Sequence, residues 1–245
     1  MQSTSKHQFR EVHPRQRTPK RMELKDLLRR RDSESIEAAL LVSPLGFRST
    51  YPSRQVNSLY FDSHDFRAIE HSLSGSSIRQ KARLRWYGKI EDTSQPTMEL
   101  KYKQGHLSWK ILRRTGLSIN PKASGWATAF QSEAGDCALF AIRDLLPITH
   151  HRPTTLVSYT RRYYESYDGR IRITLDEDLT FRDQTLCSGP NFHCGRPHPE
   201  KLVLEIKVAE ENLSALRDLA KTLPFVPRRF SKYCEALLGH LPHWQ

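Results

Sequence analysis

The residues best suited to chemistry in this sequence are cations that recur at every second position. In one segment the odd positions are all basic: Arg79, Lys81, Arg83 and Arg85. Side chains at alternate positions of a β-strand lie on one face. The even positions 82, 84 and 86 are apolar, so the pattern predicts a strand with one cationic face and one apolar face.

Four further segments alternate in the same way, with isolated acids among the cations. Their charged positions are Glu23 and Lys25, Glu99 with Lys101 and Lys103, Arg170 and Arg172 with Asp176, and Glu205 with Lys207. Taken alone, each strand is explained by a solvated charged face. Taken together, cations dominate strand after strand, although like charges directly across strands destabilise a sheet. If the apolar faces point outward under covering helices, the cations line a common interior that needs an anion. A ligand with many phosphates supplies it, because arginine binds phosphate oxygens bidentately.

The isolated acids have two interpretations. Each can pair with a neighbouring lysine or arginine, or it can hold a hard divalent cation, which prefers carboxylate and phosphate oxygens. Glu205 is the first candidate metal ligand and Glu23 the second. For Glu99 and Asp176 the salt bridge is the favoured interpretation.

A second cluster of metal-ligand residue types lies near residue 190. All of its members are residues that bind zinc: Cys187, His193, Cys194 and His198. The segment has no C-x-x-C pair and its spacing matches no common zinc pattern, so an ordinary polar loop is favoured. The scattered cysteines suggest no disulfide framework, which is typical of a reducing cytosol, and we expect a cytoplasmic protein.

The elements that must position these residues are mostly strands. Strands are expected at 20–28, 55–62, 79–88, 96–105, 107–116, 154–166, 170–181 and 201–210, and helices at 33–42, 65–73, 124–145, 212–222 and 230–238. The fold class is therefore α+β: an antiparallel β-barrel of about eight strands with flanking helices, which can leave room for a ligand. We expect a basic flexible tail over 1–19 and one domain over 20–241, which suits a length of 245 residues.

Composition narrows the class of partner. The net charge is +12 and the pI about 9.7, which favours nucleic acid, anionic membrane or polyphosphate. No window approaches the roughly 18 apolar residues of a membrane span, and the first residues lack the apolar core of a secretory signal. Aromatic residues make up 9% of the sequence and no nucleic-acid motif occurs, so no specific nucleic-acid partner is expected.

Several of these segments, taken in order, resemble a known family. They are RMELK (21–25), NSLYFDS (57–63), RQKARLRWYG (79–88), MELKYK (98–103), SYTRRYYES (158–166), RIRITLDEDL (170–179), LVLEIK (202–207) and RFSKYCEAL (229–237). The series resembles the VTC domain, the polyphosphate polymerase module of the triphosphate tunnel metalloenzyme superfamily, which also contains the CYTH enzymes. The resemblance covers roughly residues 20–240.

The resemblance implies a tunnel of antiparallel strands that uses Mn²⁺ or Mg²⁺ and passes the γ-phosphate of ATP to a growing polyphosphate chain. By matching positions it implies phosphate-binding cations at Lys25, Arg83, Arg85, Lys101, Arg161, Arg172, Arg229 and Lys232. It also implies hydroxyl contacts from Tyr159 and Ser231, and a metal on Glu205. Arg79, Lys81 and Lys103 extend the basic strands and complete the expected substrate-binding set.

Two departures from the family pattern affect the expected activity. Arg21 stands where hydrolytic relatives carry a second glutamate, which weakens the case for a metal-activated water. Arg229 stands where the eukaryotic pattern has lysine. The membrane spans and regulatory domain of the eukaryotic polymerases are missing from the sequence, so a stand-alone, bacterial-type version is expected, with any membrane-protein partner left open. A triphosphatase, a non-catalytic anion-binding module and a nucleic-acid binder remain alternatives.

Overall fold

The computed structural model describes residues 16–132, 151–223 and 225–239. The strands are β1 (Gln16–Arg17), β2 (Arg21–Arg29), β3 (Arg48–Ser63), β4 (Ile78–Tyr87), β5 (Thr97–Gln104), β6 (Leu107–Arg114), β7 (Leu117–Ile119), β8 (Phe130–Ser132), β9 (His151–Glu165), β10 (Ile171–Asp183), β11 (Arg196–His198) and β12 (Lys201–Ala209). The α-helices are α1 (Ser33–Leu41), α2 (Arg67–Leu73), α3 (Trp126–Ala129), α5 (Ala215–Thr222) and α6 (Lys232–Leu238), and short 3₁₀ helices lie at Arg30–Asp32 and Glu210–Asn212.

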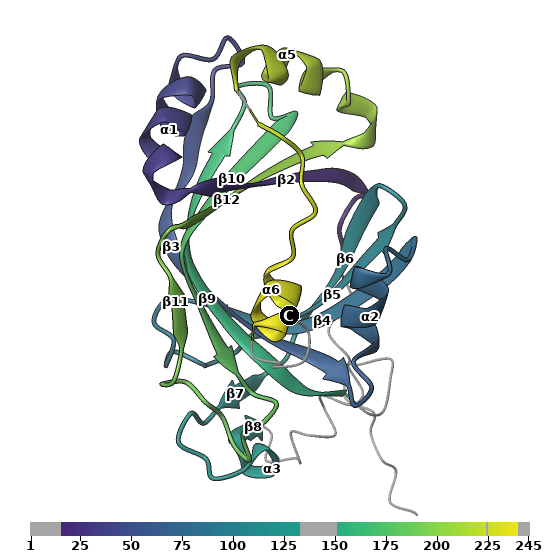
Figure 1. Cartoon of the computed structure of the whole chain (residues 1–245), viewed down its shortest axis with the longest axis vertical. Helices are drawn as coiled ribbons and strands as arrows, with labels where there is room; N and C mark the ends of the chain where they lie inside the picture. Colours follow the sequence, from purple (N-terminus) through teal and green to yellow (C-terminus); the bar gives the residue numbers. More distant parts are fainter. Residues whose placement is uncertain (1–15, 133–150, 224, 240–245) are drawn as a thin grey trace, which may run out of the picture.

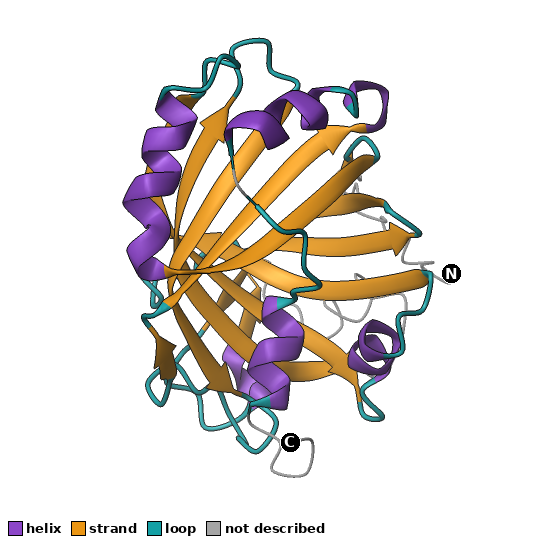
Figure 2. Cartoon of the chain, turned by 45° about the horizontal axis from the view of Figure 1, so that its top comes forward, coloured by secondary structure: helices purple, strands orange, loops and turns teal. Residues whose placement is uncertain are grey.

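The long strands close into a barrel. Their order is β6-β2-β12-β10-β9-β3-β4-β5, and β5 pairs again with β6, so the ring is complete. All of these pairings are antiparallel, and β1 and β11 are attached to β6 and β10 from outside the ring. Figure 2 shows the strands wrapping around the barrel with the helices at its ends and sides. The expected antiparallel barrel of about eight strands with flanking helices is confirmed.

The register places the charged and apolar faces as the alternation predicted. Residues directly opposite each other share a face: Arg83 lies opposite Glu99, and Lys25 opposite Glu205. The intervening side chains Leu84 and Leu204 are fully buried in clusters on the outside of the barrel. The charged positions therefore face the barrel interior.

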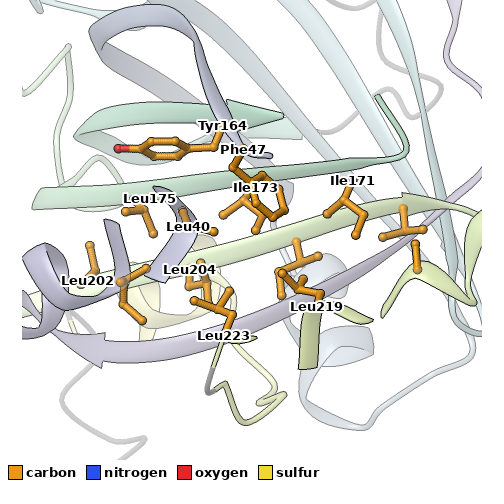
Figure 3. Close-up of a cluster of buried hydrophobic side chains, with 14 residues drawn as sticks. Leu40, Phe47, Tyr164, Ile171, Ile173, Leu175, Leu202, Leu204, Leu219 and Leu223 are labelled. Carbon is orange, nitrogen blue, oxygen red and sulfur yellow. The ribbon is translucent and has the colours of Figure 1, made fainter. Parts of the chain in front are cut away.

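Helices cover one part of the outer face. Apolar side chains of β10 and β12 pack under α1 and α5, with Leu40 and Leu219 fully buried between the layers. Figure 3 shows this cluster, and Figure 1 shows both helices beside β10 and β12. Burying each such leucine contributes about 1.5–3 kcal/mol, so this layer holds the three strands β2, β10 and β12 in place.

A different structure covers the outer faces of β4 and β5. There Leu84, Trp86 and Met98 pack against Phe130 of β8 and Phe192 of the loop before β11. The expected helix at 124–145 is wrong in its first part, because only Trp126–Ala129 is helical and β8 follows directly. Residues 133–145 lie outside the described residues. The predicted loop at 182–199 contains the short strand β11, which pairs with β10.

Helix α6 closes one end of the barrel from within. Its Tyr233 and Leu237 are buried against interior side chains, among them Tyr60, Tyr159 and Phe181. A register shift in β10, with Asp178 at φ 54°, brings Leu179 and Phe181 into this cluster. The interior therefore has an apolar end filled by α6, and cations line the remainder.

Of the predicted tail, residues 1–15 lie outside the described residues, whereas Gln16–Arg17 form β1 against β6. Among the described helices, none has the length and hydropathy needed to cross a membrane.

Candidate functional site

Cations from several strands and from α6 converge in the barrel interior. The inward-facing cations include Arg21, Lys25, Arg79, Lys81, Arg83, Arg85, Lys101, Lys103, Lys110, Arg161, Lys207 and Lys232, and the acids among them are Glu23, Glu99, Asp176 and Glu205. Cations outnumber carboxylates, so the interior carries an excess of positive charge. Each carboxylate is bound by at least two of the cations.

Glu99 of β5 is held by cations on both neighbouring strands. Arg83 donates to its Oε2 through Nε at 2.9 Å and Nη2 at 2.5 Å, and Lys110 of β6 approaches the same oxygen at 3.2 Å. Arg85 reaches Oε1 at 3.5 Å. Burial opposes ionisation of Glu99, but Arg83 and Arg85 outweigh it and hold its pKa well below the usual value. The favoured salt-bridge interpretation of Glu99 is confirmed.

Asp176 of β10 connects two strands with α6. It is fully buried, and it accepts from Arg161 Nε at 2.5 Å, from Arg161 Nη2 at 2.7 Å and from Lys232 Nζ at 2.5 Å. Burial would raise its pKa, but Arg161 and Lys232 reverse that effect. The salt-bridge interpretation of Asp176 is confirmed as well, and the carboxylate fixes the cation at the start of α6.

The two candidate metal ligands lie diagonally on neighbouring strands. In the β2–β12 register Glu23 is opposite Lys207, and Lys25 is opposite Glu205, so the two carboxylates share a face one pair apart. Glu205 contacts Lys207 at 3.1 Å and Lys25 at 3.8 Å. It also contacts Arg161 at 3.6 Å, and Glu23 contacts Lys101 and Arg21.

This donor set fits a hard divalent cation whose other ligands are phosphate oxygens and water. Mg²⁺ is usually held by one or two carboxylates together with substrate phosphates. Glu23 and Glu205 supply such a pair. Burial opposes ionisation of both carboxyl groups, but Lys101 lowers the pKa of Glu23 to about 2 and Lys207 lowers that of Glu205. Both side chains are therefore ionised at neutral pH. No group of three or more metal-ligating side chains occurs in the described residues, so protein alone does not complete a coordination shell there.

The predicted hydroxyl groups hold the cations in place. Tyr159 accepts a hydrogen bond from Arg85 Nη2 at 3.1 Å. Ser231 accepts from Lys81 Nζ at 2.8 Å and also caps α6 by accepting from the amide of Cys234. Lys81 thus points at the start of α6, and burial lowers its pKa.

Other predicted residues lie away from the centre of this network. Arg79 and Lys103 are directly opposite each other, two residues farther along β4 and β5 from Lys81 and Lys101. Arg172 shares the interior face of β10, but its side chain is 64% exposed at the rim and is paired with Glu165.

Arg229, also predicted to bind phosphate, lies at the surface. It is exposed in the segment before α6, with its guanidinium against Gly75 at the end of α2. A residue in that segment is positioned by how α6 docks, which strand alternation does not predict.

Three interior residues were missed or underrated by sequence reasoning. Lys110 lies on β6, whose inward positions include Ser108 and Leu112, so the charge alternation is broken there. Lys207 was visible in the alternation but received no role. Tyr60 accepts from Arg83 Nη1 at 2.9 Å and stacks on Tyr233 at 5.2 Å, contacts that depend on α6.

The cysteine and histidine segment is a polar loop that leads into β11, where His198 lies. Asn191 accepts from the amide of Cys194 and donates to its carbonyl, and His198 approaches Glu200 at 3.6 Å. Cys187 and Cys194 are free thiols, and the metal-ligating types in the described residues form no group of three. Cys137 lies outside the described residues.

Comparison with known proteins agrees with this geometry. The sequence model of the VTC domain matches residues 12–239. The chain therefore belongs to the VTC domain family, as the resemblance indicated.

Solved structures with similar chains include three candidate adenylate cyclases. The one from Bacillus halodurans is 19% identical with a TM-score of 0.48, over 86% of this chain and 95% of that one. The one from Vibrio parahaemolyticus is 11% identical with a TM-score of 0.47, over 88% and 97%. A candidate adenylyl cyclase from Hippeastrum, described as having a dominant triphosphatase activity, is 14% identical with a TM-score of 0.47, over 92% and 99%. The comparison with curated proteins gives no match.

Proposed function

We propose that this protein transfers phosphoryl groups within the barrel and synthesises polyphosphate from the γ-phosphate of ATP. One observation carries the proposal: Lys81, Lys101 and Lys110 lie directly opposite one another across β4, β5 and β6. Like charges in that arrangement destabilise a sheet. Glu23 and Glu99 pair with Lys101 and Lys110, and a chain of phosphates supplies further negative charge along the row, including beside Lys81.

Phosphoryl transfer requires mainly alignment and electrostatic stabilisation from the protein. Arg83, Arg85 and Arg161 are fixed by Glu99, Tyr159 and Asp176, so their guanidinium groups are already oriented. They position the γ-phosphate and stabilise charge on its equatorial oxygens. Lys25 and Lys232 lie beside them and balance the charge of the departing ADP.

The acceptor in this proposal is the terminal phosphate of the growing chain. One of its oxygens forms the new bond to the γ-phosphorus while the bond to the β–γ bridging oxygen breaks, and ADP leaves with that electron pair. The acceptor oxygen is already ionised at neutral pH, so no general base is required. Glu205 and Glu23 would hold Mn²⁺ or Mg²⁺, which neutralises charge on the phosphates when bound.

A triphosphatase is the second candidate function, because it requires the same phosphate-binding cations. The environment of Glu23 argues for transfer over hydrolysis. Arg21 lies 3.6 Å from Glu23, at the position where the hydrolytic relatives carry a second glutamate. A cation there leaves one carboxylate fewer to activate a water.

The decisive experiment incubates the purified protein with ATP and Mn²⁺ and separates the products by gel electrophoresis. Long polyphosphate chains support the proposal, and we expect Glu205→Ala and Arg161→Ala to abolish them. Arg31→Ala is the matched control, since Arg31 is 74% exposed on the surface, and it should behave as wild type. Phosphate release from inorganic triphosphate without elongation would establish the hydrolase. Tight polyphosphate binding that survives Glu205→Ala, with no turnover, would establish an anion-binding module.

A further inference from the structure

Three tyrosines surround one arginine on the inner face of β3, β4 and β9. The Arg54 guanidinium carbon lies 4.5 Å from the ring centre of Tyr51, 5.4 Å from that of Tyr163 and 5.7 Å from that of Tyr87. Tyr51 and Tyr163 also meet edge to face at 5.5 Å. We name these four residues the mouth cluster.

The strand register places the mouth cluster at the end of the barrel away from α6. Arg54 shares the inner face of β3 with Tyr60, which stacks on α6. The separation of six residues along β3 corresponds to about 20 Å, because a strand rises roughly 3.3 Å per residue. The cluster is therefore at the open end of the cation-lined interior.

The same register connects the cluster to the phosphate-binding cations. Arg54 lies directly opposite Arg161 of β9, and the guanidinium of Arg161 approaches the ring of Tyr163 at 6.0 Å. Tyr163 thus lies close to both Arg54 and the proposed phosphate ligand Arg161. A group attached to phosphates held by Arg161 would emerge against these rings.

The cluster presents surface that the fold leaves open. Tyr51 is 53% exposed and Tyr87 is 49% exposed, and large aromatic side chains at an opening offer flat faces to a ligand. Arg54 is half-buried and forms no ion pair with any residue that the structure describes. Its contacts are rings, and a guanidinium plane stacks on a further ring as readily as on these.

We propose that the mouth cluster binds the base of a nucleoside triphosphate whose phosphates enter the barrel first. The inference rests on the proposed function, which supplies the phosphate grip, and it adds the part of the site that distinguishes a nucleotide from inorganic triphosphate. Stacking of a base on an aromatic side chain makes a measurable contribution to binding affinity, and every base has a ring face that can stack. The cluster therefore selects nucleotides in general and favours the larger purine rings of ATP and GTP over pyrimidines.

The test compares two ligands that share the phosphates and differ in the base. Binding of ATP and of inorganic tripolyphosphate to the full chain is measured by calorimetry for the wild type, Tyr51→Ala, Tyr87→Ala and the double variant. We expect the double variant to lose about tenfold or more in ATP affinity, as alanine substitution at stacking sites does, and to keep its tripolyphosphate affinity within about twofold. Tyr51→Phe should restore ATP binding, since it keeps the ring.

Tyr167→Ala is the matched control: this tyrosine is 81% exposed in the turn between β9 and β10, away from the interior. It should leave both affinities unchanged. An equal loss for ATP and tripolyphosphate in the double variant, or no loss for either, would overturn the nucleobase site while leaving the phosphate grip intact. A wild type that binds neither ligand would overturn the proposed function and this inference together. Thermal melting of every variant separates these results from misfolding.

Discussion

Replacing Asp176 with asparagine tests whether the interior is built to receive an anion. The substitution keeps the shape of the side chain but removes a fully buried charge that binds both Arg161 and Lys232. Removing one partner of a buried ion pair typically costs 3–5 kcal/mol, because the other charge is left uncompensated. The amide still accepts one hydrogen bond and Glu205 still faces Arg161 at 3.6 Å, so we expect a loss of about 3 kcal/mol.

In a chain of this size that loss corresponds to a fall in Tm of roughly 6–12 °C. The variant should recover part of the loss when tripolyphosphate is added, because phosphate oxygens replace the missing carboxylate beside Arg161 and Lys232. Ligand that binds only the folded state raises Tm in proportion to its affinity. The increase on adding tripolyphosphate should therefore be larger for Asp176→Asn than for the wild type.

Differential scanning fluorimetry with and without tripolyphosphate measures both quantities. Asp218→Asn is the control, since Asp218 is an exposed acid paired with Lys221 on α5, and it should leave both Tm values unchanged. An Asp176→Asn variant that melts with the wild type would refute the claim that this carboxylate holds α6 in place. A destabilised variant whose Tm responds to tripolyphosphate no more than the wild type does would refute the anion-receiving role.

Three further predictions concern buried side chains. Burial, partly offset by Glu205, lowers the pKa of Lys207 to about 8, and Arg83 and Arg85 outweigh burial to lower that of Tyr60 to about 8. Above pH 8 the interior thus loses the positive charge of Lys207 and gains the negative charge of Tyr60. The affinity for tripolyphosphate, measured by calorimetry, should therefore fall between pH 7 and 9. A constant affinity would contradict this prediction. Both groups hold their protons to higher pH when unfolded, so they make the free energy of unfolding rise with pH in that window. Tyr233→Phe removes the hydroxyl that donates to buried Asp62 at 2.5 Å and should cost about 1–3 kcal/mol in urea denaturation, with no such cost for Tyr167→Phe.

Much of the fold was predictable from local patterns. Strict alternation on β4 and β5 fixed which side chains share a face, since successive strand residues point to opposite sides. The bounds of α1 and α6 lie within two residues of the helices expected at 33–42 and 230–238. Where alternation fails, prediction failed too: β8 follows directly on a four-residue helix, and its packing on Trp126 and the β4–β5 face is a tertiary contact.

The candidate site also combines features that the sequence predicts with features that only the structure shows. The sequence by itself determined that the interior would be cationic, that acids would stand among the cations, and that Glu23 and Glu205 were candidate metal ligands, because residue type and period two are local properties. Only the tertiary structure decided which charges meet. The register brings Lys110 beside Glu99 and opposes Lys81, Lys101 and Lys110, and the docking of α6 places Lys232 on Asp176 while leaving Arg229 outside. Strand register and helix docking are set by contacts between residues far apart in the chain, and these contacts leave no periodic signal in the sequence.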